Sequence, residues 1–438
     1  MLKTSLTNLV LRGLTLASKF ALMMLIARHA TPADMGIYGL MAVSISIALY
    51  LVGMDFYVYN TRELLARPEP ERLPLIRDQL VFHSVAYALV LPALMIVFWG
   101  GILDWRLVGW FYGLLVLEHL CLEVGRLLVA MSHPVAANLV LFGRGTVLLA
   151  VVTALSFVHS RRVELDYVWF GWSAGIVTGL IIGLWYLRGL GWRHVSAVPV
   201  DWRWIRRGLK VALPYLSATA ALLGVQYTDR YFLQQYHGEA TVGVYTFFAG
   251  FSNVVQVFAF TGITMIMYPR IVAAYQSGKT REYRDLMRKL AVRIAAAVVV
   301  LTIAAATLIH PVLSLVGKEV YAVNLSIFWI MLASTGLFAL ADIPHYALYV
   351  RGRDKALVLS TLGAFAVGLM ANVFLVPDFG LAGAATATCC AMATLVTAKG
   401  ALLLHYRKKD LAKSSIRPVV QDISIEAEVA LESTPLER

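Results

Sequence analysis

Apolar segments of about 20 residues recur along the whole of this 438-residue chain, and they constrain its fold more than any other feature. A helix of that length crosses the ~30 Å hydrocarbon core of a bilayer. Hydrophobic residues make up 59% of the sequence and charged residues 15%, with a mean hydropathy of +0.72. A soluble protein of this size would carry more charge and shorter apolar runs. We therefore expect an all-α, polytopic membrane protein.

Twelve membrane spans are predicted from the hydropathy pattern. The first is not a cleavable signal peptide, because it carries internal charge and is followed by Arg28, His29 and Pro32 instead of a small-residue cleavage site. The predicted limits are 8–27, 36–59, 79–99, 107–130, 137–158, 167–187, 210–235, 242–268, 290–309, 323–349, 355–376 and 380–404.

The basic residues indicate how these spans are oriented. If the N-terminus is cytoplasmic, 29 of the 38 lysines and arginines fall in or beside the inner loops and tails, and five fall in the outer loops. Such a positive-inside bias predicts that both termini are cytoplasmic. The net charge of +12 is then a topology signal and a match to anionic membrane lipids, so no nucleic-acid partner is expected.

The chain also repeats itself. Residues 25–38 and 232–245 align without a gap, and each copy ends one span, forms an outer turn and opens the next span with Gly-x-Tyr. Because six spans separate the copies, the two halves share one orientation in the membrane. The identical pairs are Ala33 with Ala240, Gly36 with Gly243 and Tyr38 with Tyr245.

This repeat predicts two pseudo-symmetric six-helix lobes around a central cavity. We assign 1–190 to the N-lobe, 191–209 to a cytoplasmic linker and 210–405 to the C-lobe. The polar segment 406–438 is predicted to be a disordered cytoplasmic tail.

Several segments resemble a known family, the Wzx-type O-antigen and polysaccharide flippases of the multidrug/oligosaccharidyl-lipid/polysaccharide exporter superfamily. The resemblance extends over roughly 1–405. It consists of the hydropathy pattern, the positions of turns and a few residues at the boundaries of the spans. The segments are RHATPADMGIYGL after the first span, ALPYLSATAALLGVQYTDRYFL and GVYTFF in the second half, MYPRIVAAYQSGK after span 8, and FGLAGAATAT at span 12.

The resemblance implies a function. It implies movement of undecaprenyl-pyrophosphate-linked oligosaccharide from the cytoplasmic to the periplasmic leaflet of the bacterial inner membrane, by alternating access between the lobes. Such units serve the assembly of O-antigen, capsule or exopolysaccharide, so a polysaccharide polymerase and chain-length proteins are implied as partners.

The first span carries two cations in a polar stripe. Thr4, Asn8, Arg12, Thr15 and Lys19 are spaced 4, 4, 3 and 4 residues apart and share one helical face. Each cation costs roughly 2.5–3.5 kcal/mol at a helix centre. The stripe either faces a water-filled cavity, where Arg12 and Lys19 bind the pyrophosphate of the cargo, or the two cations snorkel to the interfaces. We favour the cavity.

Span 4 carries two acidic residues with different predicted roles. Glu118 lies at a depth similar to that of Arg144 in span 5, so the two can pair across helices. Alternatively, Arg144 binds pyrophosphate, or Glu118 takes up a proton. Glu123 and Arg126 are three residues apart near the inner surface and are expected to form an interfacial ion pair. His119 points about 100° away from Glu118 and is not assigned to its site.

The remaining charges lie near the ends of spans. Asp229 and Arg230 are adjacent at the outer end of span 7, so we expect them to face different ways, one toward the cavity and one toward an outer gate, unless they form an interfacial pair. Asp55 and Lys399 are expected to anchor inner interfaces. The predicted cationic cavity is therefore Arg12, Lys19, Arg144 and Arg230, and the coupling or ion-pair residues are Glu118, Asp229, Asp55, Glu123 and Arg126.

Three classes of function compete for this chain. A lipid-linked oligosaccharide flippase needs cations in the cavity. An ion-coupled drug or metabolite antiporter of the same fold would need an acidic cavity for cationic drugs. A membrane enzyme such as a polymerase or ligase would need a large outer loop, whereas the predicted outer loops are short. We therefore expect a flippase that is not an enzyme.

No cofactor is expected. The sequence contains no nucleotide-binding or metal-binding motif, so the energy source would be an ion gradient, of H+ or Na+, or the gradient of the substrate. The three cysteines, Cys121, Cys389 and Cys390, fall in predicted spans, and we expect neither a disulfide nor a metal site from them.

The predicted topology is testable by cysteine labelling. Ser160→Cys should react with a membrane-impermeant maleimide in intact cells, because it lies in an outer loop. Ser277→Cys should react only after the cells are opened. The reverse pattern would contradict the predicted orientation.

Overall fold

The structure, a computed structural model, describes residues 2–158, 162–189 and 199–432, without the side chains of 2–6, 8–9, 69–70 and 408–432. In the described part, all regular secondary structure is helical. The first half contains α1 (Leu2–His29), α2 (Pro32–Gly53), α3 (Tyr57–Ala66), α4 (Glu69–Ala93), α5 (Ile96–Trp99), η1 (Trp105–Leu107), α6 (Val108–Ala130), α7 (Pro134–Val158) and α8 (Leu165–Leu187). The second half contains α9 (Trp202–Ser252), α10 (Val254–Ala259), η3 (Phe260–Thr264), α11 (Met265–Gln276), α12 (Thr280–Val316), α13 (Glu319–Val323), α14 (Leu325–Tyr349) and α15 (Asp354–Glu432).

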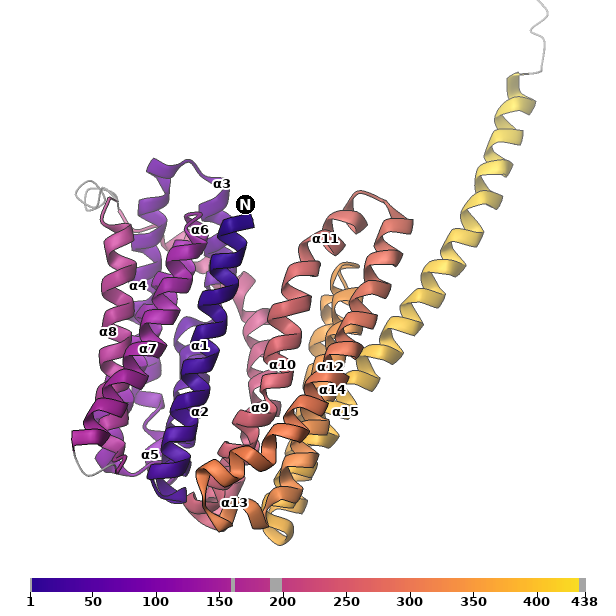
Figure 1. Ribbon diagram of the computed structural model, residues 1–438. Helices are drawn as coiled ribbons and strands as arrows, with labels where there is room; N and C mark the ends of the chain where they lie inside the picture. Colours follow the sequence, from indigo (N-terminus) through magenta and orange to yellow (C-terminus); the bar gives the residue numbers. More distant parts are fainter. Residues whose placement is uncertain (1, 159–161, 190–198, 433–438) are drawn as a thin grey trace, which may run out of the picture.

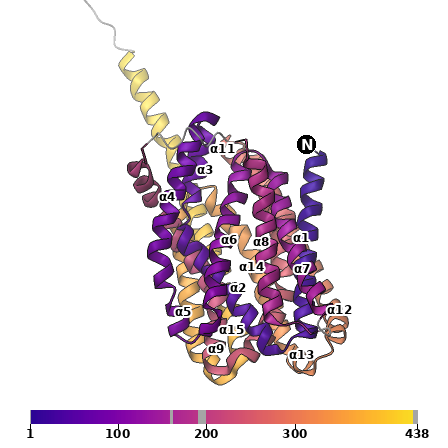
Figure 2. The same ribbon diagram turned by 90° about the vertical axis from the view of Figure 1, so that its left-hand side faces the viewer.

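The helices form two bundles, α1–α8 and α9–α15, which stand side by side in Figure 1. We call these bundles the N-lobe and the C-lobe. They meet at the end of the molecule that carries α13 and diverge toward the end that carries α3, α11 and the start of α1 (Figure 1). Figure 2 shows these two ends again, with the N-lobe facing the viewer. We call these the α13 end and the α3 end.

The number of spans follows from two glycine breaks. In the part of the chain that the structure describes, nine stretches are long and apolar enough to cross a membrane. Two of these, Trp202–Gln276 and Asp354–Arg407, are long enough to cross twice, and each is interrupted by a glycine with positive φ, Gly238 (77°) and Gly380 (51°). With α6, which is 23 residues long, the described helices provide for the twelve predicted crossings. The predicted fold class is confirmed.

Local sequence explains where several helices begin. Thr31 and Asp34 form a reciprocal capping box at the start of α2, and Pro32 occupies the first turn. Asp201 caps α9 by accepting a hydrogen bond from the Trp204 backbone N–H. This cap starts α9 at Trp202, within the segment 191–209 that we assign to the linker, and the assignment itself stays a prediction.

The second predicted span, 36–59, is also interrupted. α2 ends at Gly53, and Met54 and Asp55 adopt left-handed φ values of 47° and 50° before α3 begins. Phe56 then turns into the N-lobe, where its ring stacks on Phe82 at 4.3 Å and meets Trp204 edge-on at 5.3 Å. The first turn of α9 is thereby fixed to the N-lobe.

The repeated glycines join the two lobes. A Cβ atom on Gly36 of α2 would overlap the backbone oxygen of Glu239 in α9, and one on Gly243 would overlap the backbone oxygen of Pro32. Gly39 lies against the Thr246 side chain in the same way. Only residues without a side chain permit this approach of two backbones, so the Gly-x-Tyr repeat marks a quasi-symmetric contact between the lobes.

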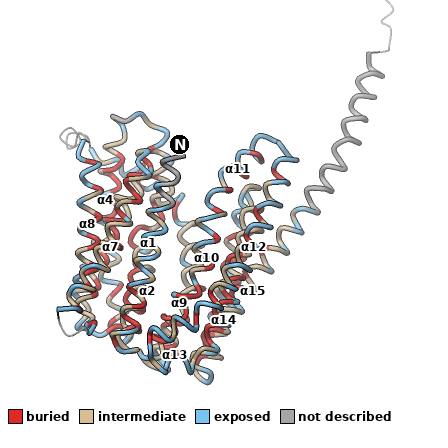
Figure 3. The backbone as a smooth tube through the Cα atoms, viewed as in Figure 1, coloured by how far each residue is buried: buried red, intermediate tan, exposed pale blue. Residues whose placement is uncertain are grey.

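A second contact closes the α13 end. Lys318, in the loop before α13, donates a hydrogen bond from Nζ to the backbone oxygen of Ala30 at the end of α1. Burial lowers the pKa of Lys318, and the nearby Asp34 carboxylate opposes this effect. Buried residues of both lobes form one continuous apolar cluster through this end of the molecule (Figure 3).

Two predictions fall on parts of the chain with little description. The helix α15 is drawn to Glu432, and the tail predicted to be disordered, 406–438, falls almost entirely on residues whose side chains, or whose whole structure, lie outside the described part. Ser160 also lies outside the described residues.

We expect Gly36→Val to separate the lobes at the α13 end, because the added side chain overlaps the α9 backbone. In a chain without its native cysteines, Thr246→Cys should then react with a maleimide several times faster than it does with Gly36 present. Gly109→Val is the matched control, because a Cβ there meets nothing within 4 Å. Equal labelling rates in the Gly36→Val and Gly109→Val variants would show that the glycine contact does not hold the lobes together.

Candidate transport site

Arg12 of α1 lies between the two lobes. Its Nε donates to Asn138 Oδ1 of α7 at 3.1 Å, and its Nη1 lies 2.8 Å from Met265 Sδ of α11 in the C-lobe. Both partners are neutral, and a thioether is a weak acceptor. The guanidinium therefore keeps its positive charge and most of its donor capacity at the junction of the lobes.

The rest of the polar stripe faces α7 more than open space. Gly145 of α7 lies against Thr15 and Ser18, so that face of α1 packs on the helix that carries Asn138 and Arg144. Lys19 is exposed as a whole residue, but its ammonium end lies buried among protein atoms, within electrostatic reach of Arg144 and Glu118. The expectation of a stripe facing a cavity along its whole length is thus corrected at Thr15, while the Thr4 and Asn8 side chains lie outside the described part.

Glu118 and Arg144 form the ion pair predicted across spans 4 and 5. Arg144 Nη1 lies 2.7 Å from Glu118 Oε2, and the indole Nε1–H of Trp172 in α8 donates to the other carboxylate oxygen. Glu118 is 2% exposed, so the pair joins three helices in the N-lobe interior. The guanidinium and the indole together offset the cost of burying this carboxylate.

A second buried carboxylate organises the C-lobe. Asp229 of α9 accepts hydrogen bonds from the Tyr245 hydroxyl and, at 2.8 Å, from the Thr388 hydroxyl of α15. Its other oxygen accepts from the Arg230 backbone N–H, and Arg230 Nη1 lies 3.3 Å from it. The expectation that Asp229 and Arg230 face different ways is wrong, because the long arginine side chain folds back along α9. The guanidinium then lies near the faces of Tyr227 and Tyr245.

Charges near the α3 end are buried inside the bundles. Asp55 is 3% exposed and Lys399 5% exposed, so interface anchoring is not their role. Lys399 Nζ instead lies 3.2 Å from His345 Nδ1 within the C-lobe.

Glu123 and Arg126 form the predicted pair, with 2.5 Å between Oε1 and Nη1. This pair belongs to a larger polar cluster in the N-lobe and is not an isolated interfacial contact. His119, as expected, does not join Glu118; its Nδ1 hydrogen-bonds to the Tyr87 hydroxyl at 2.7 Å.

The neutral members of these sites were missed from the sequence. Asn138, Trp172 and Thr388 are ordinary residues for membrane helices, and nothing in their spacing marks them. Tyr245 belongs to the Gly-x-Tyr repeat, which singled it out as a structural position but not as a partner of Asp229.

Comparison with known proteins establishes the fold alone. The chain matches no described protein family and no curated protein sequence. It is similar to the solved structure of an inward-facing multidrug resistance MATE family transporter of the MOP superfamily, with a TM-score of 0.70 and 12% identity over 92% of this chain and 96% of that one. It is also similar to the lipid II flippase MurJ in an inward closed conformation, with a TM-score of 0.71 and 12% identity over 100% of this chain and 94% of that one.

A third similar structure is the Vibrio cholerae MATE transporter VcmN, solved as a mutant, with a TM-score of 0.61 and 13% identity over 93% of this chain and 98% of that one. These comparisons, with the apolar helices, define a multi-pass membrane protein with the fold of transporters and flippases.

Removing one member of the Glu118–Arg144 pair should destabilise the protein more than removing both. Arg144→Leu leaves the buried carboxylate hydrogen-bonded to the Trp172 indole but without its paired guanidinium, and should lower the midpoint of thermal unfolding in detergent by about 5 °C or more. The double variant Glu118→Leu/Arg144→Leu should recover a large part of that loss. If the double variant instead shows the sum of the two single losses, the two side chains are not coupled.

Proposed function

We propose that this protein is a flippase that moves polyprenyl-pyrophosphate-linked oligosaccharide, with undecaprenyl as the lipid, across the bacterial inner membrane by alternating access. The observation that carries the proposal is Arg12, a cation held by neutral groups between the lobes. An anion supplied by the cargo would complete its coordination. A pyrophosphate suits it, because the guanidinium fork matches phosphate oxygens.

Lys19 offers a second position for the same anion. It lies seven residues further along α1, about 10 Å by helix rise, on the way to the α13 end. An anion that leaves Arg12 as the lobes rock would meet Lys19 next. Arg144 and Arg230 would contribute less to cargo binding than we expected, because each already has a carboxylate partner. Their role would be to stabilise the interiors of the lobes and to make the electrostatic potential of the cavity more positive.

The lobe arrangement supports alternating access. If the α3 end is cytoplasmic, as the basic residues predict, the contacts of Gly36 with α9 and of Lys318 with Ala30 close the outer side. Cargo would then enter from the inner leaflet, which agrees with the inward conformations named for two of the similar structures.

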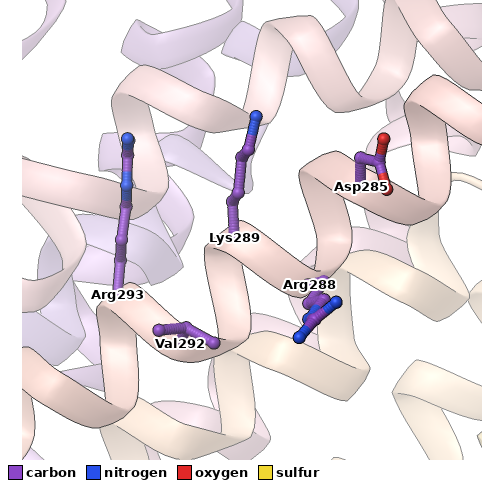
Figure 4. Close-up of a pocket in the computed structure, with 5 residues that line it drawn as sticks. All are labelled: Asp285, Arg288, Lys289, Val292 and Arg293. Atoms are coloured by element: carbon purple, nitrogen blue, oxygen red, sulfur yellow. The ribbon is translucent and has the colours of Figure 1, made fainter.

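Basic residues of α12 support contact with anionic membrane lipids at that end. Figure 4 shows Lys289 and Arg293 pointing to the same side of α12, beside a shallow pocket that Arg288 and Asp285 also line. In this position the cations would lie at headgroup level and attract anionic lipids. They would also draw the diphosphate of the cargo toward the lobes.

The alternative is an ion-coupled drug or metabolite antiporter, since two of the similar structures are MATE transporters. A cationic drug would meet Arg12 and Lys19, which repel it, so the charges favour an anionic cargo. Coupling to an H+ or Na+ gradient through Glu118 or Asp229 is part of the proposal in either case. O-antigen, capsule or exopolysaccharide assembly, with a polymerase and chain-length proteins as partners, is the setting that the proposed cargo implies.

The Arg12 side chain provides the test. In a deletion strain, Arg12→Lys should restore part of the surface polysaccharide, because it keeps the charge and loses the bidentate geometry. Arg12→Ala should restore less than about a tenth, and Arg12→Glu none, with normal amounts of inserted protein. Arg106→Glu, an exposed arginine before α6, is the control and should restore wild-type levels.

The same strains separate the rival functions. A flippase predicts that lipid-linked saccharide accumulates inside the deletion strain and in the Arg12→Glu strain. Normal polysaccharide with internal build-up of a soluble drug would support the antiporter. Wild-type polysaccharide from both Arg12→Glu and Lys19→Glu would show that these cations do not bind the cargo.

A further inference from the structure

Two histidines meet inside the N-lobe at Glu123, the carboxylate that also pairs with Arg126. His83 of α4 and His119 and Glu123 of α6 offer three ligand atoms that all lie within 4.8 Å of one another. His83 Nε2 is 3.7 Å from Glu123 Oε2, and His119 Nε2 is 4.0 Å from Glu123 Oε1. His83 and His119 are 4% and 0% exposed.

His119 is held as a metal-binding imidazole usually is. Its Nδ1 lies 2.7 Å from the Tyr87 hydroxyl, a contact that fixes the ring orientation, as outer partners do for metal-ligating histidines. Its Nε2 points toward the Glu123 carboxylate and has no hydrogen-bond partner among the described residues. A fully buried ring nitrogen that faces a carboxylate without a hydrogen bond is costly unless a cation lies between them.

Gln79 shows where the cation would lie. Its amide Nε2 donates to Glu123 Oε2 at 2.6 Å and lies 3.2 Å from His83 Nε2. This nitrogen therefore lies between the carboxylate oxygen and the imidazole nitrogen, where a metal ion bound to both would lie. Rotation of this amide by 180° would turn Oε1 toward the same point as a fourth ligand. The Gln79 oxygen now accepts from Asn60 Nδ2, and Asn60 Oδ1 is buried without a partner among the described residues.

We propose that His83, His119 and Glu123 bind a divalent transition-metal ion of the Zn2+ class, with Gln79 as an outer or fourth ligand. Two imidazoles and one carboxylate form a ligand set that zinc takes in proteins, with ligand distances of about 2.0–2.2 Å. Ligand atoms around a tetrahedral ion at those distances lie about 3.4 Å apart. The present separations, which extend to 4.8 Å at most, must therefore contract by up to about 1.4 Å through rotations of the side chains. Glu123 Oε1 is already paired with the Arg126 guanidinium, which would repel a cation there. The carboxylate would therefore bind the ion through Oε2.

The position of the site gives the ion a structural consequence. It would link α4 to α6 directly beneath the break between α2 and α3, since a Cβ on Gly53 would lie 3.3 Å from His119 Nε2. The bound ion would therefore stiffen the α3 end of the N-lobe, on the side where the lobes diverge.

Metal binding to the full-length protein tests the proposal. The protein is purified in detergent through a tag without histidine, stripped with a chelator, desalted and mixed with ZnCl2. Elemental analysis after a second desalting should find about one zinc per chain. Co2+ in place of zinc should give the visible absorption bands of a tetrahedral site, and zinc should raise the unfolding midpoint by several degrees.

Matched variants distinguish this site from adventitious binding. His83→Gln and His119→Gln should each weaken zinc binding at least tenfold and abolish the stabilisation, and Tyr87→Phe, which removes an outer partner without touching a ligand, should weaken it roughly 10–100-fold. His345→Gln, which removes a histidine of the C-lobe interior, should bind zinc as the wild type does. The proposal is overturned if the wild type retains no zinc, or if His119→Gln and Tyr87→Phe, eluting as the same monodisperse species, retain as much as the wild type.

Discussion

The approach of two backbones at Gly36 and Gly243 is the contact on which the arrangement of the lobes depends. Helices in a membrane gain little from the hydrophobic effect against one another, so small residues that allow close packing determine where they associate. Here the two glycines are equivalent positions of an internal repeat, so each lobe contributes the same feature to one junction. The Lys318 contact with Ala30 and the continuous apolar cluster lie around this point and reinforce it.

Charge inside the membrane imposes the second constraint. Glu118 and Asp229, one in each lobe, are both buried and both supplied with donors from neighbouring helices. These carboxylates therefore stabilise the lobe interiors as well as carrying charge. Arg12 differs from them, because its partners are neutral and belong to different lobes. A cation of this kind is suited to a ligand that arrives with its own negative charge.

Much of the architecture could be predicted from the sequence, because hydropathy has a direct physical relation to bilayer thickness. The equivalence of Gly36 and Gly243 could also be predicted, because it is visible as a repeat in the amino-acid sequence. The Glu118–Arg144 pair followed from estimated depth. The Asp229–Arg230 contact did not, because helical periodicity describes Cβ directions and not the path of a long side chain.

The neutral residues that bind these charged side chains could not be predicted from the sequence, for a related reason. Asn138, Trp172 and Gln79 acquire their roles only from residues on other helices, and nothing local distinguishes them. The proposed metal ligands illustrate the same limit: His83 and His119 lie on different helices, and their spacing matches no metal-binding motif. The start of α9 at Trp202 was not predicted, because Asp201 was not recognised as its capping residue.

The first turn of α9 has a consequence for how the protein moves. Trp204 is fixed beside Phe56 in the N-lobe, although the remainder of α9 belongs to the C-lobe. Ten residues later α9 contains Pro214, which cannot donate the backbone hydrogen bond of an ordinary helical residue. Proline is one of the few residues at which helices kink sharply, so Pro214 is the position in this part of α9 where bending costs least. In the alternating access that we propose, bending of α9 near Pro214 would let the C-lobe move while Trp204 stays with the N-lobe, and the resistance of this segment to bending would contribute to the energy difference between the two states.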